Sequence, residues 1–288
     1  MTRDGIVLIN KKINQVTNKE DIALKKLFNT KKVGHLGTLD PFATGLIICG
    51  INKGTKAFPF LEDKLKTYVA TLQLGSKTTT LDLTGEIIST KKPIIHTLEE
   101  IKNTLNCFLG NIKQIPPMYS AVKINGVPLY KLAFKNQTIE RKEREVYISK
   151  INLLEYNQEL NTIKFEVTCS KGTYIRTLGE DIASKLNEYG HLISLERTKI
   201  GNFELKNAKT VENITESDII PLNEIFKSFP KINIDNNEIL LKKVLNGNKI
   251  KLKNNNQIIA IYNENNLIAI YNKEENNIYK ILQMFKND

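Results

Sequence analysis

Short apolar runs, separated by glycine, proline and asparagine, dominate the hydrophobic pattern of the chain. The runs at residues 6–9 and 46–49 predict short buried strands, and alternating apolar and polar side chains over residues 66–74 predict a third strand. At two places a threonine is followed three residues later by a glutamate, the pattern of a capping box. These sequences predict helices over residues 17–29 and from residue 97 to about residue 108.

The second half of the chain continues this irregular alternation. Residues 146–154 and 162–169 predict paired strands, residues 178–187 predict an amphipathic helix, and residues 192–201 predict a further strand. This order differs from the regular strand–helix alternation of a parallel sheet, so the pattern predicts an α+β fold.

The composition changes beyond about residue 230, where asparagine-rich turns interrupt short strands. Residues 258–262 and 267–271 are two apolar runs that predict a hairpin. We therefore expect one domain over residues 1–230 and a small all-β module over residues 231–288. Within the first domain, the polar and β-branched segment around residues 76–90 predicts an exposed, thumb-like excursion.

Charge narrows the class of partner. The chain has 288 residues with 42 Lys and Arg against 31 Asp and Glu, a net charge of +11. Such an excess favours a polyanionic partner, nucleic acid above all. A membrane is the competing interpretation, but no apolar run approaches the roughly 20 residues that a span requires. The first apolar run is also too short for the core of a signal peptide, so we expect a cytoplasmic protein without a membrane partner.

The cysteines and histidines do not predict a metal site. Three of each are present, and they are scattered along the chain without the spacing of a disulfide framework or a zinc site. We therefore expect chemistry without a metal or a cofactor.

The strongest local signal is the loop at residues 34–45, which holds three glycines, His35, Asp40 and Pro41. Its glycine spacing fits neither the dinucleotide-binding fingerprint nor the Walker pattern. Pro41 disfavours a helical conformation at Asp40, so the loop should hold the carboxylate at a fixed angle before the strand. Taken alone, Asp40 could equally cap a turn, as aspartate before proline often does.

Further motifs change this balance. They are residues 66–68, 115–121, 172–176 and 195–197, which follow the loop at residues 34–45. Together with the loop, and in the same order from Gly5 to about Gly201, they resemble the motif set of the TruB-type tRNA pseudouridine-55 synthases, the bacterial type 1 family. The resemblance implies a catalytic domain of the pseudouridine synthase type with a mixed, mainly antiparallel sheet. The tail is similar to the family's PUA-type module in position, size and β character.

The resemblance also implies the reaction. A uridine in the T-loop of tRNA would have its uracil detached from the ribose, turned over and rejoined through carbon, without cofactor or metal. The implied partner is the T-loop and T-stem of tRNA, and we expect a monomer.

Three residues would carry the chemistry by this resemblance. Asp40 would be the nucleophile that breaks the glycosidic bond, and Arg176 would hold it ionised. Tyr68 would pack against the uracil, with removal of the proton from its carbon as a second role. Without the resemblance, Tyr68 would be read as an ordinary strand residue and Arg176 as a surface residue.

Five further residues would contact the RNA by the same resemblance. Tyr174 and Leu195 match positions that line the uracil pocket, and His35 matches one that helps to hold the flipped nucleotide. Lys56 and Arg197 are candidates for phosphate contacts.

Two other functions stay open at this point. One is a guide-RNA-dependent pseudouridine synthase, which would share Asp40 but select its target through another RNA. The other is a tRNA-binding folding chaperone whose chemistry is dispensable. An intact Asp40 and Tyr68 favour an enzyme, because binding alone does not need a carboxylate that faces phosphates.

Overall fold

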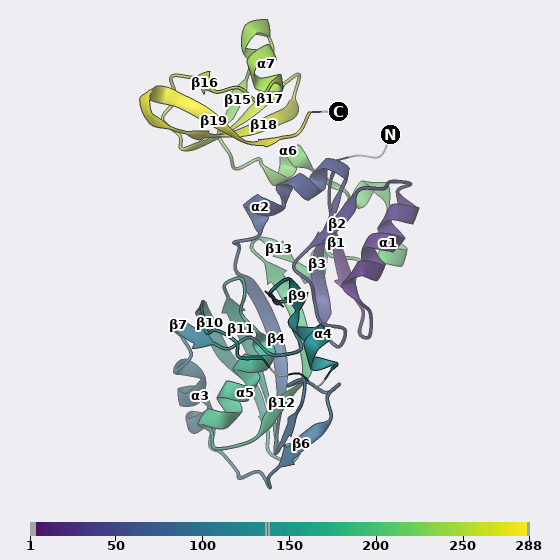
Figure 1. The fold of residues 1–288 in the computed structure, drawn as a ribbon, viewed down its shortest axis with the longest axis vertical. Coiled ribbons are helices and arrows are strands. Elements are labelled where there is room, and N and C mark those ends of the chain that lie inside the picture. The colour runs from purple at the N-terminus through teal and green to yellow at the C-terminus, as the bar shows by residue number, and fades with distance from the viewer. Residues whose placement is uncertain (1–3, 136, 138, 287–288) are drawn as a thin grey trace.

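One large mixed sheet organises the molecule (Figure 1). The structure is a computed structural model that describes residues 4–135, 137 and 139–286. Within these residues, ten strands pair in the order β14-β1-β3-β12-β4-β11-β10-β7, with β2 beside β3 and β13 beside β12. They are β1 (Gly5–Lys11), β2 (Val33–Leu36), β3 (Thr44–Ile51), β4 (Lys66–Leu74), β7 (Gly110–Gln114), β10 (Arg144–Asn157), β11 (Thr162–Cys169), β12 (Gly190–Ile200), β13 (Phe203–Glu204) and β14 (Ile220–Pro221). The predicted α+β class with a mainly antiparallel sheet is confirmed.

Helices cover one face of this sheet. The long ones are α1 (Thr17–Leu27), α3 (Leu98–Asn106) and α5 (Ile175–Lys185); α5 packs on β12 and β4, and α3 on β10. Short ones are α2 (Phe58–Leu61), α4 (Leu129–Ala133), α6 (Leu222–Ile225) and the 3-10 helices η1 (Asn52–Ala57), η2 (Leu205–Asn207), η3 (Val211–Asn213), η4 (Glu216–Asp218) and η5 (Glu275–Asn277). The largest apolar core lies between the long helices and the sheet.

The two predicted capping boxes have different outcomes. At α3 the box is confirmed, because Thr97 and Glu100 cap each other's backbone N–H groups. At α1 the prediction is wrong: the helix begins after Val16 without a side-chain cap. The hydroxyl of Thr17 instead donates to the carbonyl of Leu39 and accepts from its N–H, both at 3.2 Å. Thr17 therefore ties α1 to the loop that carries Asp40.

A parallel pairing joins β3 to β12 in the large sheet, over the short register Glu196 to Thr44 and Arg197 to Gly45. Gly45 has φ +102°, and a Cβ there would lie 2.4 Å from the carbonyl oxygen of Arg197. A side chain at this position would push the strands apart. The loop of residues 37–43, which contains Asp40, enters the sheet at this junction.

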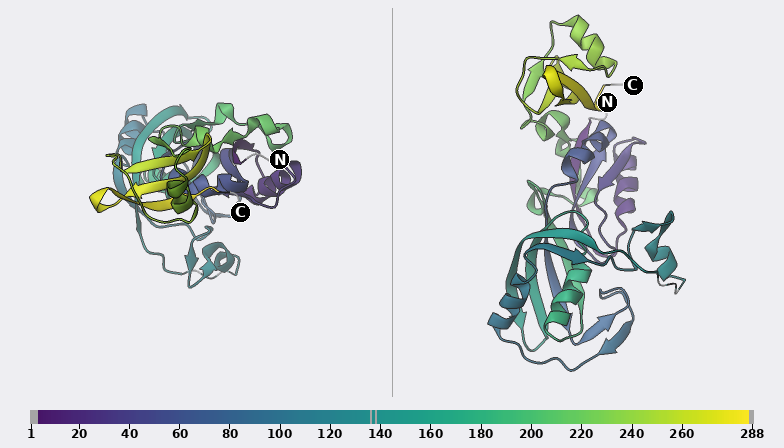
Figure 2. Two further views of the ribbon diagram at one scale, coloured as in Figure 1. Left: turned by 90° about the horizontal axis from the view of Figure 1, so that it is seen from above. Right: turned by 60° about the vertical axis from the view of Figure 1, so that its left-hand side comes forward.

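Two excursions leave the large sheet. Residues 76–90 contain the antiparallel pair β5 (Ser76–Thr78) and β6 (Ile87–Thr90). Residues 115–135, which we call the arm, contain α4 and the hairpin of β8 (Lys123–Ile124) and β9 (Val127–Pro128). Figure 2 shows the arm projecting sideways from the body of the molecule.

A second sheet lies at the C-terminal end. Its strands pair in the order β15-β17-β18-β19-β16, with bounds β15 (Lys231–Asn233), β16 (Ile250–Lys251), β17 (Ile258–Asn263), β18 (Asn266–Lys273) and β19 (Ile278–Met284). The predicted hairpin is β17–β18. The sheet also carries α7 (Glu238–Leu245), which the sequence pattern did not predict.

A continuous apolar cluster fixes this module to the large sheet. It joins side chains of β1 and β3 to side chains of β17 and β18. Phe226 lies at its centre, 1% exposed, with edge-to-face contacts to Phe60, Phe229 and Phe285 at centroid distances of 5.1, 5.3 and 5.4 Å. These rings come from α2, from the segment after α6 and from the end of β19, so they link the two sheets.

Among the described residues, none of the helices combines the length and the apolar character needed to cross a membrane.

Substituting Phe226 tests the docking of the module. Phe226→Ala should lower the free energy of unfolding by about 3–5 kcal/mol, because it removes a large buried ring and leaves a cavity. Denaturant unfolding measures the change. Phe134→Ala is the matched control, since Phe134 is 74% exposed and should cost far less. Equal losses in the two variants would show that the aromatic cluster does not hold the module.

Candidate active site

Asp40 lies in the loop of residues 37–43. A buried lysine, Lys11, binds the backbone of this loop through a hydrogen bond. Lys11 is fully buried, and its ammonium donates to the carbonyls of Lys12, Gln15 and Pro41 at 3.0, 2.8 and 3.2 Å. Burial lowers the pKa of Lys11 to about 8. The Pro41 carbonyl also accepts from the N–H of Asn14 at 2.8 Å. The position of the acid is therefore set by its backbone.

Arg176 connects four segments of the site. It lies in the first turn of α5 with only 4% of its surface exposed. Its Nε donates to Oδ2 of Asp40 at 2.9 Å, its Nη1 to the carbonyl of Thr80 at 2.8 Å, and its Nη2 to the carbonyl of Tyr119 at 2.7 Å. Nη1 also lies 3.4 Å from Oδ2 of Asp82. The structure thus pairs Asp40 with Arg176 and joins both to the excursion and to the arm.

Asp82 is a site residue that the sequence did not reveal. Its side chain is 5% exposed, and Oδ1 accepts from the hydroxyl of Thr80 at 2.7 Å and from the N–H and hydroxyl of Thr84 at 2.9 and 2.5 Å. Leu81, with φ +61°, turns the chain into this arrangement. The Thr-x-Asp-x-Thr pattern of an aspartate-centred turn was the available signal. Its closeness to Arg176 arises only from the fold.

The electrostatics leave Asp40 less acidic than an ordinary aspartate. Removal from water raises the pKa of its carboxyl, Arg176 opposes that shift, and the charge of Asp82 adds to it. The side chain is still 39% exposed, so the carboxyl faces the surface from a partly enclosed position. A carboxylate with a raised pKa beside a fixed cation can serve as a nucleophile and remains accessible to a substrate.

Tyr68 lies on the strand behind the loop. It belongs to β4, pairs in register with Arg197 of β12, and is 8% exposed. Burial raises the pKa of its hydroxyl, and the guanidinium of Arg197 opposes the shift. The side chain of Tyr68 belongs to the same apolar core as Leu39 and Phe42, which flank the Asp40 and Pro41 pair in the loop.

Arg197 requires a correction, because its burial contradicts a phosphate contact. It is 1% exposed, its Nε donates to the carbonyl of Leu46 at 2.7 Å, and its Nη2 donates to the carbonyl of Gly37 at 2.8 Å. These carbonyls belong to β3 and to the start of the Asp40 loop. Arg197 therefore holds the junction of β3 and β12 together and does not face solvent.

Tyr174 and Leu195 lie next to elements that carry Arg176 and Tyr68. Tyr174 directly precedes α5, and its backbone N–H and carbonyl bond the side-chain amide of Gln114 at 3.0 and 3.3 Å. Leu195 is 6% exposed and belongs to the same apolar core as Tyr68. Gln114, which is buried, is a further support that the sequence did not identify.

His35 and Lys56 lie in different parts of the molecule. His35 is in β2, where its ring contacts Asp21 and Thr38. Lys56 is in η1, and its ammonium donates to the carbonyl of Met284 at 3.0 Å, at the end of the C-terminal sheet. The structure does not bring Lys56 into the Asp40 cluster, and we reassign it to docking of the C-terminal module.

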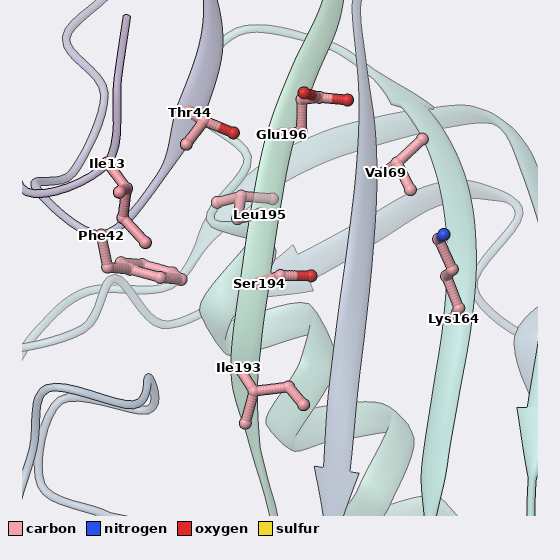
Figure 3. Close-up of a pocket in the computed structure, with 9 residues that line it drawn as sticks. All are labelled: Ile13, Phe42, Thr44, Val69, Lys164, Ile193, Ser194, Leu195 and Glu196. Carbon is pink, nitrogen blue, oxygen red and sulfur yellow. The ribbon is translucent and has the colours of Figure 1, made fainter.

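A cavity of about 260 Å³ is lined by side chains of β3, β4, β11 and β12 and by Phe42 of the Asp40 loop (Figure 3). Val69 and Glu196, which line it, alternate along their strands with Tyr68 and Arg197, so they point away from the acid. Asp40 and Arg176 are not among the lining residues, which are Ile13, Phe42, Thr44, Val69, Lys164, Ile193, Ser194, Leu195 and Glu196. In the described part of the chain, no three His, Cys, Asp or Glu side chains gather closely enough to hold a metal ion.

Comparison with solved structures supports the fold. The chain matches the structure titled "Crystal Structure of a Cbf5-Nop10-Gar1 Complex" with a TM-score of 0.70 and 22% identity, over 98% of this chain and 85% of that chain. It matches an H/ACA RNP bound to a substrate RNA with a TM-score of 0.69 and 19% identity, over 98% and 85% of the two chains.

Comparison with curated sequences shows the family. The chain is 40% identical to tRNA pseudouridine synthase B of Borreliella burgdorferi (strain ZS7) over 83% of this chain and 84% of that protein. It is 38% identical to the protein of that name from Mycoplasma mycoides subsp. mycoides SC, over 98% and 97%. Residues 25–175 match the model of the TruB family pseudouridylate synthase N-terminal domain. Fold and sequence thus define an isomerase of the pseudouridylate synthase class. Within this class, the chain belongs to the TruB family.

Replacing Arg197 with lysine separates a structural role from a phosphate contact. A lysine cannot donate to the carbonyls of Leu46 and Gly37 in the same fork geometry. Arg197→Lys should therefore lower the free energy of unfolding by about 2–4 kcal/mol, since each buried acceptor left unpaired costs roughly 1–3 kcal/mol. Exposed Arg144 provides the control, Arg144→Lys. A variant with wild-type stability would contradict the structural role and favour a phosphate contact, which lysine can also make because it keeps the charge.

Proposed function

We propose that this enzyme converts a uridine in the T-loop of tRNA, at position 55, to pseudouridine. The observation that carries the proposal is the ion pair of Asp40 with Arg176, with Tyr68 buried in the strand behind it. The names of the relatives, tRNA pseudouridine synthase B, support tRNA as the substrate, and the net charge of +11 supports a polyanionic partner. We further propose that residues 1–230 form the catalytic domain, residues 231–288 the PUA-like module, and that the protein acts as a monomer without a cofactor.

The reaction begins with extraction of the base. A uridine inside a folded RNA loop must be flipped out before a side chain can reach its glycosidic bond. Tyr68 would then pack against the uracil, with Tyr174 and Leu195 lining the pocket. His35 would hold the displaced nucleotide from the far side of the Asp40 loop.

Asp40 acts as the nucleophile in the next step. Arg176 binds Oδ2 and so leaves Oδ1 as the oxygen that attacks. Oδ1 bonds to C1′ of the ribose as the bond between C1′ and N1 of the uracil breaks. The base turns, and a bond from C1′ to C5 forms as the bond between C1′ and Oδ1 breaks, which releases the carboxylate. C5 loses its proton and N1 gains one, so the product is an isomer and no other reactant is needed.

Tyr68 serves this sequence chiefly as a packing surface. Its raised pKa keeps the hydroxyl protonated, so it could accept the C5 proton only after losing its own. We therefore propose packing against the uracil as the main role of Tyr68 and proton removal as its secondary role.

A transcript assay distinguishes the proposed function from its alternatives. Asp40→Asn should abolish pseudouridine formation on unmodified tRNA transcript, mapped by carbodiimide primer extension, and tRNA affinity should stay close to wild type. The amide keeps the shape of the side chain but is not a nucleophile. Asp63→Asn is the control, because Asp63 is an exposed carboxylate whose side-chain surface is 75% accessible.

Measurable pseudouridine formation by Asp40→Asn would show that Asp40 is not the nucleophile. Wild-type activity that appears only with an added guide RNA would favour the guide-dependent alternative. If the wild-type protein binds tRNA but forms no pseudouridine, the tRNA-binding folding chaperone would be the remaining alternative.

The pH dependence of the rate tests the charge balance around Asp40. The ionised carboxylate is the active form, so kcat/KM should fall as the pH drops through the raised pKa of Asp40. Asp82→Asn removes the nearby negative charge that raises this pKa, so the acid limb should move to lower pH. The asparagine can still accept from Thr84, which preserves the turn.

Asp181→Asn is the control for this shift. Burial and Glu180 raise the pKa of Asp181 to about 6, yet it lies outside the Arg176 cluster. Its substitution should leave the acid limb in place. An unchanged limb in Asp82→Asn would show that Asp82 does not act on the nucleophile.

A further inference from the structure

Asp21 and His35 form a buried pair beside the Asp40 loop. Asp21 lies on α1 and His35 on β2, and Nδ1 of the imidazole is 2.7 Å from Oδ2 of the carboxylate. Their side chains are 16% exposed for His35 and 10% for Asp21. The second carboxylate oxygen, Oδ1, is buried without a hydrogen-bond partner among the described residues. Residue Cys49 pairs with His35 in register, and burial followed by the neighbouring Asp21 raises the pKa of its thiol, so the thiol stays protonated.

This geometry sets the proton on the ring. A carboxylate only accepts hydrogen bonds, so Nδ1 carries a hydrogen and donates it to Asp21. Nε2 then faces the loop, where the hydroxyl of Thr38 is 3.2 Å away. Thr38 is two residues before Asp40 in the chain, so the second ring nitrogen contacts a side chain of the loop that carries the acid.

The buried face of α1 supports this loop at two points. Thr17 and Asp21 are one helical turn apart and both buried. Thr17 bonds the backbone of Leu39, and Asp21 bonds the ring that meets Thr38. A buried carboxylate is costly, and an apolar residue would pack a helix at this position more cheaply. Its presence points to a task beyond packing.

We propose that Asp21 is the positioning residue of His35. It fixes the Nδ1-protonated form and the orientation of the ring, so that Nε2 is presented to the RNA beside Asp40. Asp21 itself does not contact the substrate. The inference rests on the proposed function, in which His35 holds the flipped nucleotide.

Nitrogen NMR of the free protein tests the structural half of the proposal. The chain has three histidines, so the ¹⁵N-labelled His35 ring is assigned by its absence in His35→Gln. Wild-type His35 should carry a proton on Nδ1. In Asp21→Val the Nε2-protonated tautomer should appear, whereas Asp21→Asn should keep the wild-type tautomer, because its amide oxygen still accepts. An unchanged His35 spectrum in Asp21→Val would overturn the proposal.

Kinetics on tRNA transcript test the functional half. Asp21→Val should lower kcat/KM about tenfold, the lower end of the loss seen when a metal-binding histidine loses its carboxylate partner, and Asp21→Asn should restore most of that loss. In a His35→Gln background, Asp21→Val should have no further effect, because Asp21 acts only through the ring. An equal loss in both backgrounds would make Asp21 a purely structural residue and overturn the proposal.

Glu188→Gln is the matched control. Glu188 is a second buried carboxylate beside a histidine, 3.8 Å from Nε2 of His96 and outside the Asp40 loop. Its loss should leave kcat/KM and the His35 spectrum unchanged, and a tenfold loss there would count against a specific role for Asp21. If the wild type makes no pseudouridine, the proposed function fails, whereas the NMR measurement still decides whether Asp21 orients His35.

Discussion

The contacts of one buried guanidinium hold the site together. Arg176 meets Asp40, the carbonyls of Thr80 and Tyr119, and Asp82, which lie on three segments that are distant in sequence. A buried cation is stable only if its donors are satisfied, and here carbonyls and carboxylates satisfy them together. The loop, the excursion and the arm therefore have a common anchor. Because Arg176 binds both the carbonyl of Tyr119 in the arm and the carboxylate of Asp40, a movement of the arm would shift the partner of the nucleophile.

The charges around that anchor explain how a carboxylate can be both bound and reactive. Arg176 alone would stabilise the ionised form of Asp40 and weaken its attack. Burial raises the pKa of Asp40 most, and Asp82, which shares the same guanidinium, adds to that shift, so the pKa ends above its ordinary value. Arg176 therefore orients the carboxylate of Asp40, but its positive charge does not fully neutralise that carboxylate.

The sequence predicted elements that depend on local patterns and missed contacts that depend on the fold. The strand over residues 66–74 coincides with β4, and the capping box at Thr97 is present, because alternation and caps are local. The box at Thr17 failed because its hydroxyl binds Leu39 instead. Arg197 looked like a phosphate contact because its burial at the β3–β12 junction cannot be read from neighbouring residues. Asp82 was overlooked for the same reason.

These supports share one physical principle, which is preorganisation of the backbone. Lys11 bonds the carbonyl of Pro41, Thr17 bonds Leu39, and Arg197 bonds Gly37, so main-chain groups on both sides of Asp40 are fixed. None of these bonds uses the carboxylate, whose only recorded partner is Arg176 in front of it. The loop can therefore be rigid while one carboxylate oxygen stays available. Rigid placement of a reacting group lowers the entropic part of the barrier before any substrate arrives.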